Sequence, residues 1–208
     1  MNAPIQQLGV KYPPLLNLPE RLETERLILR PFAAGDGANV FASIDENRTL
    51  AKQFMPWVDD HDTVEASEAY ARRMHSLWIS RAGLTLAVFE RATGNYLGGI
   101  GPHTIDWKIP SMELGYYFRP SAWGKGFAAE ACGTICDLCF NHAQCVRIYA
   151  WIHSDNTQSM RVMEKAGFVR EGVLRLNGRD HHGKNHDAIM YSMLREDFLI
   201  SKTHQNEQ

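Results

Sequence analysis

Gly124, Lys125 and Gly126 lie between a segment with strand character and a segment with helical character. Glycines let a backbone curl tightly, so successive N–H groups and the start of the following helix can face one anion. A phosphate group could be held there. The segment is not a Walker loop, because no Ser or Thr follows Lys125 at the required spacing, and it is not a dinucleotide fingerprint, because position 129 is Ala. On these residues alone, a plain tight turn explains the pattern as readily as a phosphate site.

Cysteine and histidine clusters raise the question of a metal. Three of the four cysteines would share one face of a helix, and no CxxC pair has a distant second pair, so small buried core residues explain them better than metal ligands. Three histidines lie in a polar connection near the end of the chain, where a solvated loop explains them. We therefore expect no metal. The residues are Cys132, Cys136, Cys139 and Cys145, and His181, His182 and His186.

The elements that must position these residues follow from hydrophobic periodicity. Strands are expected at residues 23–32, on both sides of the turn 91–95, and at 111–118, 146–152, 168–176 and 188–194. Helices are expected around 40–44, from Asp62 or Thr63 through Trp78, at 125–142 and at 156–166. The order predicts an α/β fold with a central mixed sheet, antiparallel meanders, and one parallel pair joined by the helix at 125–142.

Length and composition are those of one globular domain. The chain has 208 residues, of which 44% are hydrophobic and 22% charged, which is enough material for a core. Residues 1–20 contain three prolines and no sustained periodicity, so we expect an extended leader, a single domain over 21–200 and a short tail over 201–208.

Charge and segment composition exclude several classes of protein. Lys and Arg total 22 against 24 Asp and Glu, so there is no overall basic field for nucleic acid. No apolar run approaches the roughly 20 residues that span a bilayer. The first residues lack a basic start followed by an apolar stretch, which argues against a secretory signal. Together with cysteines that suit a reducing compartment, this favours a cytoplasmic protein.

Several short motifs, in order over residues 23 to 195, resemble the GNAT superfamily of acyl-CoA-dependent N-acyltransferases, and within it the RimJ/RimL-like ribosomal-protein N-acetyltransferases. The diphosphate loop of the superfamily matches at Gly124 to Ala128, but it opens with Gln or Arg where this chain has Trp123, a departure typical of that branch. The other motifs are Glu25 to Arg30, Met55-Pro56-Trp57, Glu113 to Tyr116, Asn156 with Ser159, Glu164 to Phe168, and Glu171-Gly172.

The resemblance implies a GNAT-like fold with a splayed sheet that binds acetyl-CoA as co-substrate, without a metal. The pantetheine would pair with backbone presented by Tyr116 and Phe118, between the strands at 111–118 and 146–152. The diphosphate would be held by the backbone of the loop. The implied cofactor-binding residues are Tyr116, Phe118, Gly124, Lys125, Gly126, Phe127, Ala128, Asn156 and Ser159.

Set against the chemistry of acyl transfer, the resemblance gives two catalytic candidates. Glu113 would accept the proton of the amine, directly or through water, although a half-exposed surface glutamate is an equal reading. Ser159 would relay a proton to the departing thiolate, while Asn156 can also be a helix N-cap. His103 and His153 are reserve bases, although a structural or solvated histidine is the more frequent explanation of each. We expect direct transfer in a ternary complex, because no well-placed nucleophile appears.

The acceptor implied by the resemblance is an amine, the N-terminal α-amine of a protein, and a ribosomal protein is the example that the branch suggests. Small-molecule acceptors remain open, namely a polyamine, an amino acid or an aminoglycoside, as does a non-catalytic acyl-CoA-binding module. Homodimerisation is known among relatives, but no feature of the sequence points to it. Four aromatic residues could be core or acceptor wall: Trp57, Tyr70, Trp78 and Trp107. The acidic segment 59–62 is expected to be a solvated turn.

Overall fold

The computed structural model describes residues 9–180 and 182–205, which form one eight-stranded mixed sheet covered by helices. The strand order is β1-β2-β3-β4-β5-β6-β8-β7, and the pairing of β5 with β6 is parallel while the other neighbours are antiparallel. The strands are β1 (Leu22–Glu23), β2 (Leu27–Pro31), β3 (Leu86–Glu90), β4 (Tyr96–Asp106), β5 (Ser111–Phe118), β6 (Arg147–His153), β7 (Val169–Arg179) and β8 (Asn185–Leu194). The expected mixed α/β architecture is confirmed.

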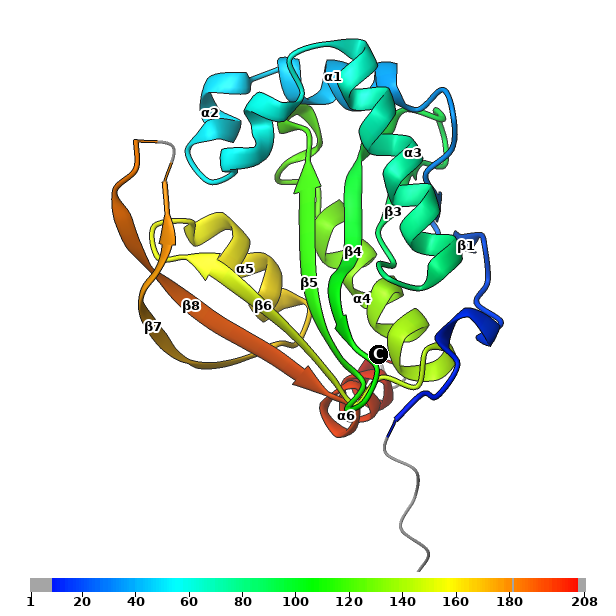
Figure 1. Cartoon of the computed structure of the whole chain (residues 1–208). Helices are drawn as coiled ribbons and strands as arrows, with labels where there is room; N and C mark the ends of the chain where they lie inside the picture. Colours follow the sequence, from blue (N-terminus) through cyan, green and yellow to red (C-terminus); the bar gives the residue numbers. More distant parts are fainter. Residues whose placement is uncertain (1–8, 181, 206–208) are drawn as a thin grey trace, which may run out of the picture.

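The helices lie on both faces of this sheet (Figure 1). They are α1 (Gly37–Asp45), α2 (Arg48–Lys52), α3 (Val64–Ser80), α4 (Phe127–Asp137), α5 (Thr157–Lys165) and α6 (Arg195–Gln205). Short 3-10 turns lie at η1 (Pro13–Leu15), η2 (Pro56–Asp60) and η3 (Pro120–Ala122), and α4 continues into a single π-helical segment, η4 (Leu138–His142).

Alternation along β5 separates two hydrophobic clusters. Met112, Leu114 and Tyr116 pack with α4 in the larger cluster, which also holds the buried cysteines of that helix. Tyr117, one residue along, packs with α1 and α3 in the smaller cluster. Successive side chains of a strand point to opposite faces. Glu113 therefore lies on the same face of β5 as Tyr117, the face that α1 and α3 cover only in part.

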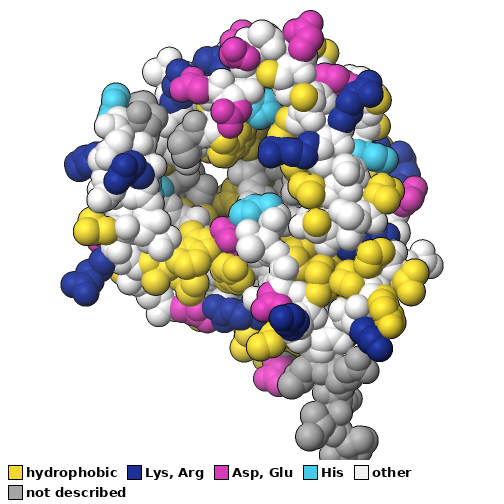
Figure 2. Space-filling model, viewed as in Figure 1, with side chains coloured by type: hydrophobic (Ala, Val, Ile, Leu, Met, Phe, Trp, Pro, Cys, Tyr) yellow, Lys and Arg dark blue, Asp and Glu magenta, His cyan; other side chains and the backbone are white. Residues whose placement is uncertain are grey.

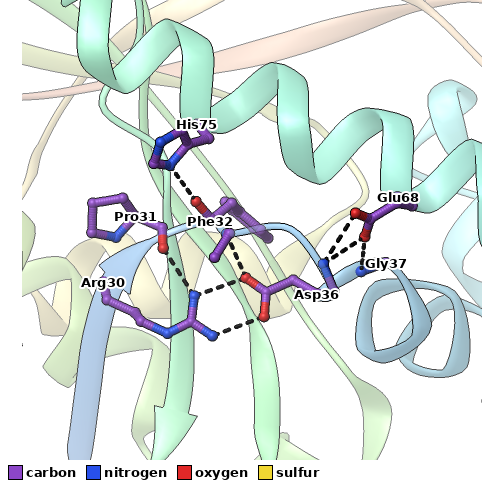
Figure 3. A network of polar contacts seen from close by, with 9 residues as sticks. Arg30, Pro31, Phe32, Asp36, Gly37, Glu68 and His75 are labelled. Atoms are coloured by element: carbon purple, nitrogen blue, oxygen red, sulfur yellow. Dashed lines mark hydrogen bonds and ion pairs between the residues drawn. The ribbon is translucent and has the colours of Figure 1, made fainter.

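A polar network holds α1 and α3 against β2 (Figure 3). Asp36 accepts two hydrogen bonds from the Arg30 guanidinium, both of 2.8 Å, and a third from the backbone N–H of Ala33. Glu68 of α3 accepts from the N–H groups of Gly35 and Gly37, so one carboxylate caps the start of α1. The bidentate pair of Arg30 with Asp36 adds geometric specificity as well as energy. The network thus joins the end of β2 to the start of α1 and to α3.

Helix starts were predicted well because they depend on local residues. Thr63 caps α3 by accepting from the N–H of Ala66 at 3.1 Å, and α4 with η4 spans nearly the expected range. All four cysteines are buried and free, as expected of core residues. Of the four aromatic residues, Trp78 is a core residue, whereas Trp57 stays 39% exposed.

Other expectations were wrong. Strand β7 extends past residue 176, and strand β8 begins before residue 188. His186 therefore belongs to β8 rather than to a solvated loop. His181 lies outside the described residues. His61 is 3% exposed and hydrogen-bonded to Ser67, so the acidic segment is only partly a solvated turn. Helices α2 and α6 were not predicted. The five residues of α2 are too few to show a helical period, while α6 is only weakly amphipathic and occupies part of the expected tail.

Candidate active site

The strands β5 and β6 meet at one end and then separate. Only three residue pairs join them, Ser111 with Arg147, Met112 with Ile148, and Glu113 with Tyr149, although both strands continue. Figure 1 shows the two strands diverging from their common start. The backbone edge of β5 beyond Glu113 is therefore not covered by β6. An uncovered strand edge can accept an extended chain as an added strand.

The glycine loop follows the free end of β5. Gly124 and Gly126 have φ values of 73° and 81°, in the left-handed region that favours glycine, and a Cβ atom at Gly124 would meet nothing within 4 Å. Gly126 is the N-cap of α4 and supplies no side-chain cap. The first N–H groups of a helix have no intrahelical partner, so those of α4 are available to an anion. Trp123, which replaces the usual Gln or Arg, donates from Nε1 to the carbonyl of Phe118 at 2.6 Å and ties the loop to β5.

Arg26, the residue just before β2, clamps this loop through its side chain. Its Nη1 donates to the carbonyl of Lys125 at 2.9 Å, and its Nε donates to Glu130 of α4 at 2.7 Å. The guanidinium also lies 4.9 Å from the ring centroid of Phe127, and Thr24 donates its hydroxyl to Glu130. Arg26 is thus committed to protein partners. Its motif was noticed in the sequence, but the contact with the loop spans about 100 residues and left no local signal.

Lys165 approaches the same loop from the end of α5. A Cβ atom built at Gly126 would lie 3.8 Å from Lys165 Nζ and 3.5 Å from Arg26 Nη2. Within the part of the chain that the structure describes, the Lys165 ammonium has no ion pair. Arg26 is therefore a committed cation beside the loop, whereas Lys165 and Lys125 of the loop itself form no ion pair with the described residues. Sequence reasoning missed Lys165, whose only signal was its place in the Glu164 to Phe168 motif.

The start of α5 faces β5 across the gap between the strands. Asn156 accepts from the N–H of Ser159 at 3.0 Å, so it is the N-cap of α5. The Tyr116 hydroxyl donates to the carbonyl of Ser159 at 3.2 Å, and burial raises the pKa of Tyr116 well above its usual range. The half-buried Ser159 hydroxyl itself makes no hydrogen bond to the described residues. Tyr116, Asn156 and Ser159 are thus brought together.

Glu113 stands where β5 and β6 separate. Its carboxylate lies 3.7 Å from His103 Nε2, an ion-pair distance, and its side chain is 25% exposed. Tyr149, its register partner on β6, has its pKa raised by burial and, in part, by the charge of Glu113. The sequence named Glu113 and His103 as separate candidates, and the fold makes them neighbours. His153, the other reserve base, lies further along β6, at its last residue.

Aromatic and histidine rings close the far end of the separation. Figure 2 shows this face hollowed between the β7–β8 arm and the α1–α2 region, with histidine side chains at its edge. His153 stacks on His186 of β8 with ring centroids 3.7 Å apart, and Phe54 meets His153 edge-on at 5.4 Å. Burial and the neighbouring His186 lower the pKa of His153. The rings of Trp57 and Tyr117 meet edge-on, with their centroids 6.0 Å apart.

Two kinds of chemistry have little support in this arrangement. Burial raises the pKa of the Cys132 and Cys145 thiols to about 12 each and that of Cys139 as well, so these three cysteines are not thiolate nucleophiles at neutral pH. Among residues 9–180 and 182–205, no group of three or more His, Cys, Asp or Glu side chains is placed to hold a metal.

None of the helices in those ranges is long and apolar enough to cross a membrane.

Comparison with known proteins identifies the class. Residues 26–169 match the acetyltransferase (GNAT) domain family. The chain is 29% identical over 174 residues to the uncharacterized N-acetyltransferase YoaA of Bacillus subtilis, covering 84% of this chain and 96% of YoaA. It is 26% identical over 151 residues to a spermidine N(1)-acetyltransferase of Vibrio cholerae, covering 72% of this chain and 82% of that enzyme. The RimL ribosomal L7/L12 alpha-N-protein acetyltransferase, solved with coenzyme A, superposes with a TM-score of 0.79 at 17% identity over 84% of this chain and 98% of RimL.

The chain therefore belongs to the GNAT acetyltransferase family. It is an N-acetyltransferase with the fold of RimL, and acetyl-CoA is the acetyl donor of its family. The geometry of the described residues fits that donor. The loop has two left-handed glycines and is followed by a helix start without a side-chain cap. The uncovered edge of β5 begins at the Glu113 carboxylate.

Proposed function

We propose that this enzyme acetylates the N-terminal α-amine of a protein, by direct transfer from acetyl-CoA in a ternary complex. The observation that carries the proposal is the position of Glu113. It is the last β5 residue paired with β6, so its carboxylate stands where the uncovered edge of β5 begins. An acetyl group carried along that edge would arrive beside the carboxylate. RimL, whose fold this chain shares, is named for acetylation of a protein α-amine, which supports the choice of acceptor.

The donor would be held mainly by backbone. The N–H groups from Gly124 to Ala128 lie at the start of α4 and would bind the diphosphate, with Lys125 and Lys165 supplying positive charge. Arg26 would hold the loop in place through its hydrogen bonds to Glu130 and to the carbonyl of Lys125. Tyr116 and Phe118 would offer backbone groups to the pantetheine. For Asn156, the cap of α5 is the role that its contacts support, and it orients Ser159.

Proton transfers would be divided between two groups. Glu113 would take a proton from the attacking amine, directly or through one water, because a neutral amine is the nucleophile in acyl transfer. Ser159 would pass a proton to the departing thiolate from the other side of the separation. Its hydroxyl has no hydrogen bond to the described residues, and the Tyr116 hydroxyl donates to the backbone carbonyl of the same residue. The buried cysteines give no support to an acetyl-enzyme intermediate.

A small amine is the second candidate, because the spermidine N(1)-acetyltransferase of Vibrio cholerae is a relative over most of the chain. The donor site would be the same in both cases. Only the acceptor side of the site would differ between the two candidates.

An acceptor screen separates the candidates. Thiol release from acetyl-CoA is measured with peptides that begin like ribosomal proteins, and each peptide is paired with a copy whose N-terminus is already acetylated. Spermidine, free amino acids and an aminoglycoside complete the panel. We expect release only with free N-termini. Release with spermidine and not with peptides would establish the second candidate, and acetyl-CoA binding without release for any amine would indicate a non-catalytic module.

A further inference from the structure

His103 occupies a β-bulge directly opposite Glu113. On β4, Pro102 pairs with Leu114 and Thr104 pairs with Glu113, so His103 is the extra residue between them. A bulge leaves its extra residue outside the ladder and turns its side chain in a new direction. The ring consequently does not follow the alternation of β4. It comes to lie over β5 instead.

The position of the His103 ring depends on residue 115 being a glycine, which has no side chain. A Cβ atom at Gly115 would lie 2.7 Å from Cδ2 and 2.9 Å from Nε2 of His103, closer than real Cβ contacts allow. Only glycine at this position lets the imidazole rest beside Glu113. Nδ1 is 3.2 Å from the Thr104 hydroxyl, which leaves Nε2 directed to the carboxylate at 3.7 Å.

Exposure increases from the carboxylate to the imidazole. The Glu113 side chain is 25% exposed and the His103 side chain is 47% exposed. On the β6 side, Glu113 faces Tyr149, whose own charged neighbours are Arg147 and Asp106. The guanidinium of Arg147 is engaged by Glu171. Within the described residues, His103 is thus the one basic side chain paired with Glu113, and it lies on the way to solvent.

We propose that His103 is the proton relay of Glu113. This rests on the proposed role of Glu113 as the base. The amine gives its proton to the Glu113 carboxylate. Because the carboxylate and His103 Nε2 are 3.7 Å apart, one bridging water then takes the carboxylic proton as its O–H bond breaks and gives one of its own protons to Nε2. This restores the carboxylate and forms an imidazolium, which loses one proton to water. No electrons are exchanged, and Glu113 is ready for the next turnover. Histidine suits this task because it gains and loses a proton near neutral pH.

Chemical rescue tests the relay. His103→Ala should lower kcat by roughly tenfold or more with the acetyl-CoA KM unchanged. Added imidazole should restore most of the lost rate, because a free imidazole can enter the space and carry the proton. His103→Gln is the alternative variant if the alanine variant is unstable. His142→Ala, which removes an exposed histidine at the end of η4, is the control and should behave as wild type with and without imidazole.

The same assays with Glu113→Gln distinguish the two proposals. A slow Glu113→Gln variant that imidazole does not restore, beside a His103→Ala variant that it does, supports both. Normal turnover in Glu113→Gln removes the base, and the relay with it. If Glu113→Gln is slow, two results for His103→Ala would overturn the relay and leave the base in place. One is full activity, and the other is a low rate that no imidazole concentration restores.

Discussion

Arg26 donates from Nη1 to the carbonyl oxygen of Lys125 at 2.9 Å, so the residue before β2 holds the middle of the glycine loop. The same side chain pairs with Glu130 one turn into α4. The loop is therefore fixed at its centre and at the helix that follows it, before any ligand is bound. Preorganised binding groups lose less entropy when the ligand arrives.

Loss of this clamp should weaken donor binding. Arg26→Met keeps much of the apolar stem but removes the hydrogen bonds to the loop and to Glu130. We expect the KM for acetyl-CoA to rise about tenfold, which corresponds to about 1.4 kcal/mol. Steady-state kinetics check this. Arg21→Met is the control because, among the described residues, the ion pair of Arg21 is with nearby Glu23 alone. An Arg26→Met variant with unchanged KM would contradict the clamp.

Lys165 should act on phosphate rather than on the fold. Lys165→Gln removes a cation 3.8 Å from the position of a Cβ at Gly126, and no ion pair within the described residues is broken. We expect KM to rise several-fold for acetyl-CoA and to stay unchanged for S-acetylpantetheine, which has no phosphate. Lys108→Gln, in the turn at the opposite end of β5, is the control. An equal loss with both donors would show that Lys165 acts on folding or on the acyl group instead.

The hydroxyl of Ser159 can be separated from the cap of α5. Asn156 binds the backbone N–H of Ser159, so Ser159→Ala keeps the cap, whereas Asn156→Ala should lower the free energy of unfolding by about 1 kcal/mol. If the hydroxyl serves the thiolate, Ser159→Ala should slow the single-turnover rate by roughly tenfold or more at unchanged stability. Rapid-quench and thermal-unfolding measurements on both variants test this. An unchanged single-turnover rate would remove Ser159 from the mechanism.

The outer half of the sheet should lose stability in acid through one carboxylate. Arg147 donates two hydrogen bonds to Glu171, of 2.7 and 2.5 Å, and Ser192 donates a third of 2.7 Å. These contacts lower the pKa of Glu171 from 4.5 to about 2. Between these values the unfolded chain binds more protons than the folded chain, so the contribution of Glu171 is complete above 4.5 and is lost as the pH falls toward 2.

Glu171→Gln measures that contribution. Because the side chain is 37% exposed, solvent screening limits the expected loss at neutral pH to about 1 kcal/mol in the free energy of unfolding. The difference in the free energy of unfolding between wild type and Glu171→Gln should shrink as the pH is lowered from 4.5 toward 2. Denaturant unfolding at a series of pH values follows it. A difference that is constant with pH would show that the lost volume or hydrogen bonds, rather than the charge, stabilise the fold.

Features that depend on neighbouring residues were predictable from the sequence. The caps at Thr63 and Asn156, the strand at 111–118 and the glycine turn before α4 each follow from a few consecutive side chains. The parallel pairing of β5 with β6 followed from the long helical crossover between them. The fold class could therefore be derived, and the glycine loop located at the start of α4.

Features that depend on tertiary packing could not be derived. His103 and Glu113 are ten residues apart on different strands, and their meeting requires a bulge and a glycine whose joint effect no periodicity encodes. Arg26 and Lys165 reach the loop from distant segments. His186 was placed in a loop because the polar residues of the β7–β8 hairpin hide its strand pattern, although its ring is held against His153.

The role of Glu113 is tested most directly by kcat together with acetyl-CoA affinity in Glu113→Gln. The glutamine keeps the size of the side chain and removes its ability to accept a proton. We expect kcat with the best acceptor to fall by about a hundredfold or more, while the calorimetric Kd for acetyl-CoA stays within about twofold of wild type. Wild-type turnover in this variant would contradict the account, because the carboxylate at the point where the strands part would then take no share in the reaction.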